Sequence, residues 1–501
     1  MAIVVSHIAD DFDVLATRAL RQAPLSDLIE IRLDRIGHPG RERLGAFLRA
    51  AGKPVIVACP GPEAYGSFAG ELEQRLELLR DAAELGARFV DVDWTSSLEL
   101  GLVKPPCHRI VSRHELEGTP GDLERVHEEV QAVLYEGDVT KIVTRARSCE
   151  DGLSLLRWLR TTRGVVAFTS GEEGRFTRVL APIFGSPFTY CAPAADPGEE
   201  APPATAPGQI PVNELRAMLP PGGVSQETAI LGVVGRPSAH SLSPWVQGMG
   251  LKAARLDAVY VAFEPQGLRG FLDLAEDQNF RGFSITAPFK EEARALAAAR
   301  DEATERSGAA NTLLREKDGW RAANTDVSAV RETLTQAFAI HGRAGREPHE
   351  IARATTLVLG SGGAARAVIW AVRSLGGRAL VAGRKRERAE RIAREVGCET
   401  VPWAEIPRLA YDVLVNATPV GSVGHEEGPV VPPDWIRPGA IVLDAVYRPI
   451  RTKFLLAAHE RGCTAVPGGE WFVRQAMHQF RLFTRHDPDE GLMRKAFEHA
   501  L

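Results

Sequence analysis

A glycine-rich segment in the C-terminal half has the spacing of a dinucleotide-binding turn. Gly360, Gly362 and Ala365 fit the pattern G-x-G-x-x-[GA], and the apolar run TTLVLG (355–360) predicts a strand leading into it. Glycines at these positions let the backbone turn tightly and approach a pyrophosphate, which then lies at the N-terminus of the following helix. The segment therefore predicts a nucleotide cofactor site that also includes Gly363 and Ala364.

The next expected strand, RALVAG (378–383), indicates which nucleotide this site prefers. An NAD enzyme usually carries an acidic residue after this strand, where it binds the ribose hydroxyls. Here Arg384 and Lys385 follow instead. Two cations suit the extra phosphate of NADP, whereas the ordinary alternative is a solvated basic helix start. We predict NADP as the cofactor.

Lys290 and Asp326 are residue types that could transfer a proton during ketone reduction. A hydride delivered to a ketone leaves an alkoxide, so an acid must supply a proton at the same place. Lys290 follows Pro288-Phe289 at the expected end of a strand, and Asp326 closes the run Asn-Thr-Asp. A lysine paired with a carboxylate across a cleft can hold and donate that proton. For an isolated lysine and aspartate, a surface salt bridge is the ordinary interpretation.

A second lysine in the N-terminal half has the setting of a nucleophile. Lys141 begins the apolar run KIVT (141–144), where desolvation lowers the pKa of an amine and frees it for attack. His114 has an ordinary pKa near neutrality, which suits proton removal. Glu30 and Arg32 alternate with apolar residues, so both side chains would face the same side of a strand. In isolation, a Lys and a His are more often a buried structural residue or solvated surface.

Repeated strand-then-helix units position these residues. Apolar runs such as PVIVAC (54–59) and GVVAFT (164–169) alternate with helical stretches such as ELEQRLELLRDAAEL (71–85). About eight such units in roughly 200 residues favour a barrel over an open sheet. The predicted fold class is α/β, with an N-terminal (β/α)8 barrel (1–219), an α/β substrate domain (228–340, completed by C-terminal helices within 468–501) and a Rossmann-type NADP-binding domain (350–467).

The composition excludes several classes of protein. The 501 residues are 44% hydrophobic and 25% charged, with a net charge of -5 and no basic run for nucleic acid. No apolar run approaches the roughly 18 residues of a membrane span, and the N-terminus lacks a secretion signal. The six cysteines form no Cys-x-x-Cys pair, which favours a reduced cytoplasmic protein without a metal site. We expect small-molecule partners, neither nucleic acid nor membrane, and a monomer.

Seven motifs in order give the C-terminal half a specific resemblance. They are VVGRPSAHSLSP (233–244), FSITAPFKEEA (283–293), GAANTL (308–313), AANTD (322–326), LGSGGAARA (359–367), VNATPVG (415–421) and PGGEWFVRQA (467–476). Together they resemble shikimate dehydrogenase over some 270 residues.

This resemblance assigns roles to single residues. It implies that Lys290 and Asp326 are the catalytic pair, and it places Ser284 where the family commonly has Asn. Hydroxyl and amide groups suit a polyol ring because they offer hydrogen bonds rather than charge. The residues implied to bind substrate are Ser241, Ser243, Thr286, Asn311, Gln475 and Tyr447, and those on the nicotinamide side are Asn416, Thr418 and Gly468.

The N-terminal half resembles type I 3-dehydroquinate dehydratase over residues 3–219. The motifs are EIRLD (30–34), DVDW (91–94), IVSRHELEGTP (110–120), GDVTKIV (137–143), FTRVLAPIFGSPFTY (176–190) and ATAPGQI (204–210). That family forms a Schiff base between a lysine and the ring ketone, which implies this role for Lys141 and proton transfer for His114. The implied substrate-binding residues are Glu30, Arg32, Arg178, Thr205 and Gln209.

One departure from this second family concerns substrate binding. The family usually has an arginine shortly after the second strand, where this chain has Pro60. The acidic partner expected a few residues later is either displaced to Glu63 or missing. Losing a substrate-binding cation costs several kcal/mol of transition-state stabilisation. The sequence leaves open whether the barrel is active.

The two resemblances imply consecutive reactions. A dehydratase would convert 3-dehydroquinate to 3-dehydroshikimate, and a dehydrogenase would reduce that product to shikimate with NADPH, as in the fused enzyme of plants. Three alternatives remain: a dehydrogenase with an inactive barrel, a non-catalytic sensor of pathway intermediates, and a quinate-oxidising dehydrogenase that uses NAD. Retained Lys141, His114, Lys290 and Asp326 argue against the sensor, and Arg384 and Lys385 argue against the NAD enzyme.

Overall fold

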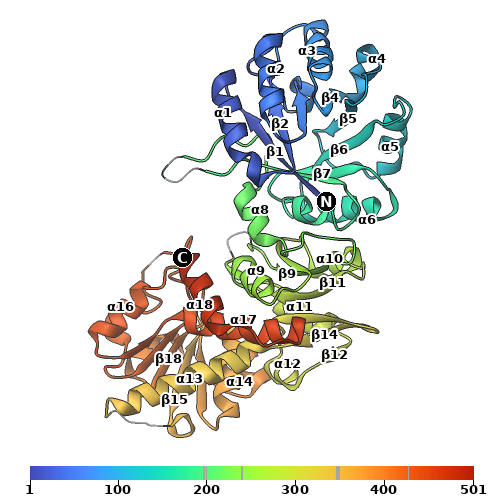
Figure 1. Cartoon of the computed structure of the whole chain (residues 1–501). Helices are drawn as coiled ribbons and strands as arrows, with labels where there is room; N and C mark the ends of the chain where they lie inside the picture. The colour runs from blue at the N-terminus through green and yellow to red at the C-terminus, as the bar shows by residue number, and fades with distance from the viewer. Residues whose placement is uncertain (196–197, 199, 239–240, 346–349, 427) are drawn as a thin grey trace. The chain divides into compact units, whose positions relative to one another are not determined.

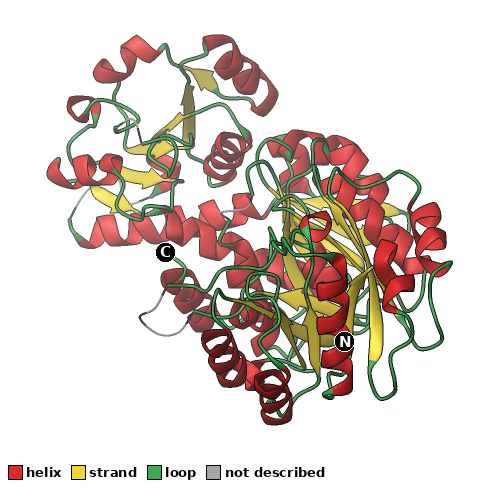
Figure 2. Ribbon diagram, turned by 90° about the horizontal axis from the view of Figure 1, so that it is seen from above, coloured by secondary structure: helices red, strands yellow, loops and turns green. Residues whose placement is uncertain are grey.

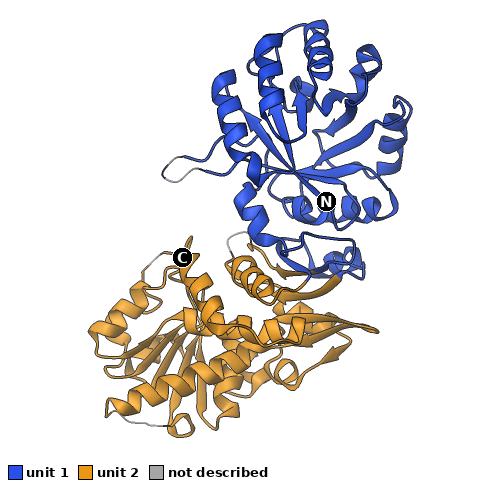
Figure 3. Ribbon diagram, viewed as in Figure 1, with its two compact units in different colours: residues 1–229, 257–279 blue, residues 230–256, 280–501 orange. Residues whose placement is uncertain are grey.

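The computed structural model describes residues 1–501 except 196–197, 199, 239–240, 346–349 and 427. Parts of the motif 233–244 and of the expected loops 191–209 and 341–354 therefore lie outside the described residues. The chain divides into two compact units, one of residues 1–229 and 257–279 and one of residues 230–256 and 280–501 (Figure 3). The domain boundaries expected from the sequence stay predictions.

Eight parallel strands of unit 1 form a nearly closed barrel in the order β7-β6-β5-β4-β3-β2-β1-β8 (Figure 1). In Figure 2, helices lie around the strands of the barrel that contains the N-terminus. The predicted α/β fold with an N-terminal barrel is confirmed. The strands are β1 (Ala2–Ile8), β2 (Leu28–Arg32), β3 (Val55–Ala58), β4 (Phe89–Asp93), β5 (His108–Glu115), β6 (Val139–Arg145), β7 (Val166–Ser170) and β8 (Phe188–Cys191). The helices are α1 (Phe12–Gln22), α2 (Arg41–Ala50), α3 (Leu72–Glu84), α4 (Ser97–Leu100), α5 (Leu123–Gln131), α6 (Cys149–Thr161), α7 (Thr177–Leu180) and α8 (Val212–Met218).

Apolar and polar side chains alternate along strand β2, so that one set lies in the apolar core and the other faces a cavity. Ile29 and Ile31 of β2 belong to the apolar core that includes residues of α1, α2 and α3. Glu30 and Arg32, the intervening residues, line a cavity. Successive side chains of a strand point to opposite faces, so the same strand contributes alternate residues to the core and to the cavity.

Residues 257–279 of unit 1 contain β10 (Ala258–Phe263) and α10 (Leu268–Leu274). Arg160 of α6 donates to both carboxylate oxygens of Asp277, at 2.7 and 2.9 Å. The rings of Phe176 and Phe263 lie 4.9 Å apart. These contacts hold the segment against the helical layer of the barrel.

Unit 2 contains a parallel sheet in the order β17-β16-β15-β18-β19-β20. Numbered from its first strand this is the order 3-2-1-4-5-6 of a dinucleotide-binding fold, so the predicted Rossmann domain is confirmed. Its strands are β15 (Thr355–Leu359), β16 (Arg378–Ala382), β17 (Glu399–Thr400), β18 (Val413–Asn416), β19 (Ile441–Asp444) and β20 (Thr464–Val466). Its helices are α14 (Gly363–Ser374), α15 (Arg386–Val396) and α16 (Lys453–Glu460).

The other sheet of unit 2 mixes parallel and antiparallel pairs. Within this unit the order is β9-β11-β13-β14-β12, with β9–β11 and β12–β14 parallel and the rest antiparallel. The long helices α13 and α17 pack against each other. The strands are β9 (Ala229–Val234, whose first residue the division leaves in unit 1), β11 (Phe280–Ile285), β12 (Ala299–Arg300), β13 (Thr312–Glu316) and β14 (Gly319–Ala323). The helices are α9 (Ser243–Ala253), α11 (Lys290–Leu296), α12 (Glu302–Ser307), α13 (Thr325–Arg343), α17 (Gly468–Thr484) and α18 (Glu490–His499).

Candidate active sites

The barrel encloses a small cavity of about 40 Å³. Strands β2, β5, β6, β7 and β8 supply part of its wall, while α7 and the loops after β3 and β8 supply the rest. All the barrel residues that the sequence singled out line it: Glu30, Arg32, His114, Lys141, Arg178, Thr205 and Gln209.

Lys141 lies in this cavity beside a carboxylate. Its Nζ donates to Asp91 Oδ2 at 2.6 Å, and the two side chains are only 9% and 8% exposed. Ser112 donates to the other oxygen of Asp91 at 2.6 Å, and the ring of Tyr190 lies 4.8 Å from Nζ. An amine must lose its proton before it attacks a carbonyl. Asp91 is the carboxylate in place to accept it.

His114 is partly buried, and its buried Nδ1 has no hydrogen-bond partner among the described residues. Burial, with a smaller contribution from the charge of Lys141, lowers the pKa of His114 to about 3. The sequence predicted titration near neutrality for this residue, because the ordinary pKa of a histidine takes no account of burial. The imidazole is therefore neutral over the physiological range and can accept a proton.

Arg178 lies in the same cavity without a carboxylate partner among the described residues. Its Nη1 donates to the Tyr190 carbonyl at 3.2 Å, its Nε has no partner there, and its guanidinium lies 4.6 Å from the Phe168 ring centre. Burial lowers the pKa of Arg178 to about 10, which leaves it charged at neutral pH. A buried guanidinium with an unused donor suits a ligand carboxylate.

A hydrogen-bond network joins the remaining polar residues of the barrel site. Thr205 donates to Ser6 at 2.7 Å, and Ser6 donates to Glu30. Arg32 donates to Asp34 through two nitrogens, at 2.9 and 3.0 Å, and to the Thr205 carbonyl at 3.0 Å. Burial raises the pKa of the Glu30 carboxyl. The network fixes the side chains around the cavity before a ligand arrives.

The loop that carries Pro60 brings no carboxylate into this cavity. Glu63 pairs instead with Arg75 at 2.5 Å, and its side chain is 43% exposed. Ala64 and Tyr65 are the residues of this loop that line the cavity. Of the two alternatives expected from the sequence, a partner displaced to Glu63 does not agree with this arrangement.

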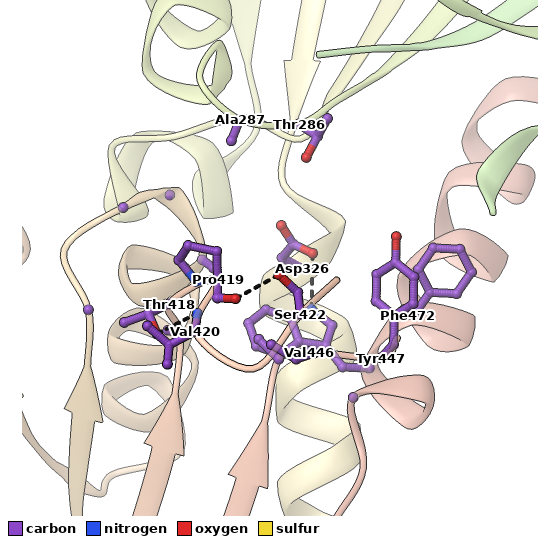
Figure 4. Close-up of a pocket in the computed structure, with 18 of the residues that line it drawn as sticks. Thr286, Ala287, Asp326, Thr418, Pro419, Val420, Ser422, Val446, Tyr447 and Phe472 are labelled. Atoms are coloured by element: carbon purple, nitrogen blue, oxygen red, sulfur yellow. Dashed lines mark hydrogen bonds between the residues drawn. The ribbon is translucent and has the colours of Figure 1, made fainter. Parts of the chain in front are cut away.

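Unit 2 contains a much larger cavity, of about 930 Å³ (Figure 4). Figure 4 shows Thr286 and Ala287 above it, Thr418, Pro419 and Val420 on one side, and Tyr447 and Phe472 on another. The residues predicted from the sequence that line it are Ser241, Ser243, Thr286, Asp326, Gly360, Gly362, Gly363, Ala364, Arg384, Lys385, Thr418, Tyr447, Gly468 and Gln475.

The predicted catalytic pair is formed. Lys290 Nζ donates to Asp326 Oδ2 at 2.6 Å, with side chains 17% and 7% exposed. Trp471 donates its indole N–H to the other oxygen, Oδ1, at 3.0 Å. Lys290 is the first residue of α11 rather than the end of a strand, because β11 ends at Ile285. Asp326 lines the cavity, whereas Lys290 is not among the lining residues and is bound to the site through this fixed carboxylate.

The glycine turn fits a dinucleotide, and its backbone also contacts the lysine. Gly360 has φ 127°, and a Cβ there would lie 2.8 Å from the Ala417 carbonyl oxygen. A Cβ at Gly363 would lie 2.8 Å from Lys290 Cδ. Arg384 and Lys385 line the same cavity. The turn offers close backbone approach for a pyrophosphate and two cations for a further phosphate.

Two predicted residues lie behind the cavity wall. Asn416 Oδ1 accepts from the Thr418 N–H at 3.0 Å, and its Nδ2 donates to Asp444 at 2.8 Å. Asn311 accepts from the Thr325 N–H at 2.8 Å. Both amides hold the backbone of turns from which other residues reach the cavity.

Sequence reasoning missed residues that contact the predicted ones. Asp91 lies within the quoted motif DVDW, and a charged residue inside an apolar strand was the signal that could have identified it. Trp471 lies within PGGEWFVRQA, and Tyr65 lies in the loop after Pro60. Their partners come from distant segments, so local spacing gave no sign of the contacts.

In the described part of the chain, no three His, Cys, Asp or Glu side chains are grouped so as to hold a metal ion. None of the helices described there combines the length and apolar character needed to cross a membrane.

Comparison with known proteins identifies both halves. The family described as type I 3-dehydroquinase matches residues 3–223, and the shikimate dehydrogenase substrate binding domain matches residues 233–313. The shikimate dehydrogenase (NADP(+)) of Anaeromyxobacter dehalogenans strain 2CP-1 is 36% identical over 287 residues, 55% of this chain and 98% of that protein. The chloroplastic bifunctional 3-dehydroquinate dehydratase/shikimate dehydrogenase of Arabidopsis thaliana is 29% identical over 495 residues, 95% and 81% of the two chains. A shikimate dehydrogenase solved in complex with NADP+ is 26% identical, with a TM-score of 0.50 over 55% of this chain and 96% of that one.

The fold and the two cavities define an α/β enzyme that joins a lysine-containing barrel to a Rossmann-type dehydrogenase. The chain belongs to the shikimate dehydrogenase family and carries a type I 3-dehydroquinase domain ahead of the dehydrogenase. The family resemblances inferred from the sequence motifs are confirmed, and the shikimate dehydrogenase relatives are named as NADP(+) enzymes, in agreement with the cofactor predicted from Arg384 and Lys385.

Proposed function

We propose that this chain catalyses two consecutive reactions, dehydration of 3-dehydroquinate to 3-dehydroshikimate and reduction of that product to shikimate with NADPH. The observation that carries the proposal is a repeated arrangement. Each unit holds a lysine 2.6 Å from a buried carboxylate at the site of a cavity. We further propose that the chain is a cytoplasmic monomer, a location that agrees with its six free cysteines, since thiols stay reduced in the cytoplasm.

In the barrel, Lys141 attacks the ring ketone and forms a C–N bond while the carbonyl oxygen leaves as water. Asp91 takes the proton that the ammonium must lose first. His114, kept neutral by burial, removes a proton from the carbon next to the iminium, and the hydroxyl on the following carbon departs as a second water. Hydrolysis of the Schiff base consumes one water, which restores the ring ketone and frees Lys141, so the net loss is one water. Arg178 binds the substrate carboxylate throughout.

In unit 2, NADPH supplies the hydride when bound. Lys290 gives a proton to the oxygen on which negative charge develops, and Asp326 holds the ammonium in position for that transfer. Ser241, Ser243, Thr286 and Gln475 offer hydrogen bonds to the substrate carboxylate and hydroxyls, because hydroxyl and amide groups line the cavity there. The glycine turn, with Arg384 and Lys385, binds the phosphates of the cofactor.

The test is NADPH consumption by the purified chain supplied with 3-dehydroquinate alone, with 3-dehydroshikimate in a parallel tube. Oxidation in both tubes supports two reactions in series. No oxidation in either tube contradicts the proposal for both sites.

One alternative has a specific observation in its favour. Pro60 replaces a substrate-binding arginine, and Glu63 lies outside the barrel cavity. A barrel without activity would give oxidation with 3-dehydroshikimate only. The variant Pro60→Arg would then be expected to restore the dehydratase reaction.

A further inference from the structure

The barrel cavity is too small for its proposed substrate as it stands. A volume of about 40 Å³ has room for about three water molecules. A six-membered ring that carries a carboxylate and hydroxyl groups needs several times that space. Some part of the wall must therefore move when the substrate enters.

The wall has fixed parts and parts that can move. Glu30, His114 and Lys141 lie on paired strands of the nearly closed barrel, which cannot shift without breaking their ladders. Tyr65 lies instead at the end of a short turn, directly after the 3-10 helix Pro62–Ala64. This turn bonds mainly to itself: the N–H groups of Ala64 and Gly66 both donate to the Gly61 carbonyl, at 3.0 and 2.8 Å. Such a turn can move as one body about its ends.

Contacts from across the barrel hold the tyrosine in place in the closed form. Tyr65 has φ 57°, a conformation that residues other than glycine rarely adopt. Its carbonyl accepts from Arg32 Nη2 at 2.9 Å, and its hydroxyl lies 2.9 Å from Ser170 Oγ. Its ring stands edge-on to His114 at 6.3 Å between centroids. Residues of three different strands therefore hold the phenol over the cavity.

The partners of Ser170 determine which hydrogen bond the Tyr65 hydroxyl can still form with a ligand. Either hydroxyl could donate in the Tyr65–Ser170 bond, but Ser170 Oγ also lies 3.4 Å from the Thr144 carbonyl. We therefore assign the Ser170 proton to that carbonyl and the role of donor to the phenol. The phenol oxygen then keeps its acceptor capacity free for a ligand. A ring hydroxyl of the substrate is a donor of the right kind.

We propose that Tyr65 is a substrate-contacting residue on a movable cover of the barrel site. The turn of residues 60–66 opens to admit the ring and closes so that the phenol oxygen accepts a hydrogen bond from a substrate hydroxyl. This inference rests on the proposed dehydratase reaction.

The test compares Tyr65→Phe with the unaltered full chain. Phenylalanine keeps the ring beside His114 but removes the hydroxyl, so kcat/KM for 3-dehydroquinate should fall about tenfold, chiefly through KM. Ser170→Ala should give a fall of similar size, and the double variant should be no worse than the poorer single one, because the two hydroxyls act together. Reduction of 3-dehydroshikimate by the same preparations should not change, which controls for folding.

Tyr135→Phe is the matched control. Tyr135 stacks on Arg109 elsewhere in the barrel and does not line the cavity, so its loss of a hydroxyl should leave kcat/KM unchanged. An unaltered kcat/KM in Tyr65→Phe, or an equal loss in Tyr135→Phe, would overturn the inference. Multiplicative losses in the double variant would contradict the role of Ser170.

A second measurement separates this inference from the proposed reaction. If the unaltered chain shows no dehydratase turnover, calorimetric titration with 3-dehydroquinate, in saturating NADP and shikimate, measures binding to the barrel alone. Binding about tenfold weaker in Tyr65→Phe supports the contact even in a silent barrel. Equal affinities of the two proteins reject it.

Discussion

The barrel site and the dehydrogenase site use the same pair of groups in opposite surroundings. Each has a lysine Nζ 2.6 Å from an aspartate oxygen, but one borders a cavity of about 40 Å³ and the other a cavity of about 930 Å³. The small cavity suits a nucleophile that bonds directly to a single substrate and needs little water near it. The large one must hold a dinucleotide and a ring acid side by side. The size of the cavity, rather than the paired residues, distinguishes the two chemistries.

The two pairs also differ in how they are held. Lys141 and Asp91 lie on β6 and β4 of one sheet, and Ser112 on the strand between them orients the carboxylate. Lys290 and Asp326 lie in the first turns of two helices, α11 and α13, and Trp471 of α17 orients the carboxylate. A sheet fixes such a pair through its backbone ladder, whereas helices depend on side-chain packing. The dehydrogenase pair should therefore be more sensitive to substitution of its neighbours.

Substituting either catalytic lysine should cause the largest loss of activity. Lys141→Ala should lower the dehydratase kcat about a thousandfold or more, because the covalent intermediate cannot form. Lys290→Met should lower the dehydrogenase kcat by about a hundredfold to ten-thousandfold, because the proton donor is lost. Each variant should keep the other activity. NADPH consumption with 3-dehydroshikimate measures it in Lys141→Ala, and the ultraviolet absorbance of the conjugated dehydration product measures it in Lys290→Met. Loss of both activities in either variant would contradict two independent sites.

Removing the cations beside the glycine turn should have the next largest effect. The double variant Arg384→Ala/Lys385→Ala loses two groups that line the cavity, so KM for NADPH should rise about tenfold to a hundredfold. KM for NADH should change little, since that cofactor lacks the extra phosphate. Steady-state rates with both cofactors measure the difference. A parallel rise for NADH would contradict a phosphate-binding role.

Trp471→Phe should have a smaller effect, confined to the dehydrogenase. Phenylalanine preserves most of the ring but removes the 3.0 Å hydrogen bond to Asp326, so kcat should fall about fivefold to tenfold with little change in KM for shikimate. The matched control is Trp158→Phe, which removes an indole hydrogen bond to Glu124 on the surface of the barrel. A rise in KM with kcat unchanged would indicate that Trp471 contacts substrate instead of orienting Asp326.

The smallest expected effect is on stability and belongs to the barrel alone. Burial lowers the pKa of His7, as it does that of His114, to about 3 from an ordinary value near 6.5. The unfolded chain binds more protons than the folded chain between these pH values, so the free energy of unfolding falls as pH falls from 6.5 towards 3. The slope is up to about 1.4 kcal/mol per pH unit for each histidine.

The variant His7→Phe tests this pH dependence. Its free energy of unfolding, measured by urea denaturation between pH 6.5 and 4.5, should fall less steeply than that of the unaltered chain. His7 does not line the cavity, and neither ring nitrogen has a partner among the described residues, so an apolar ring can replace it. Identical slopes in the two proteins would show that His7 has the same pKa in the folded and unfolded chain, which would contradict the lowering by burial.

Much of the site was predictable from residues with local signatures. Gly360, Gly362 and the cations after β16 follow from a strand, a tight turn and a helix start, which are determined within some thirty residues. Glu30 and Arg32 follow from the alternation of one strand. Two expectations were wrong. Lys290 begins a helix rather than ending a strand, and the pKa of His114 is not near neutrality, because segments far from it in sequence remove it from water. Local patterns give no measure of burial, and burial sets the pKa.

The sequence by itself determined the order of the elements, the two lysines and the phosphate-binding turn. Only the tertiary structure decided that Asp91 accepts from Lys141, that Trp471 fixes Asp326, and that Tyr65 covers the barrel cavity. It also decided that Asn311 and Asn416 hold turns rather than line the cavity. The physical reason is that spacing along the chain fixes backbone geometry, whereas a hydrogen bond between segments 50 to 145 residues apart exists only after the core has packed.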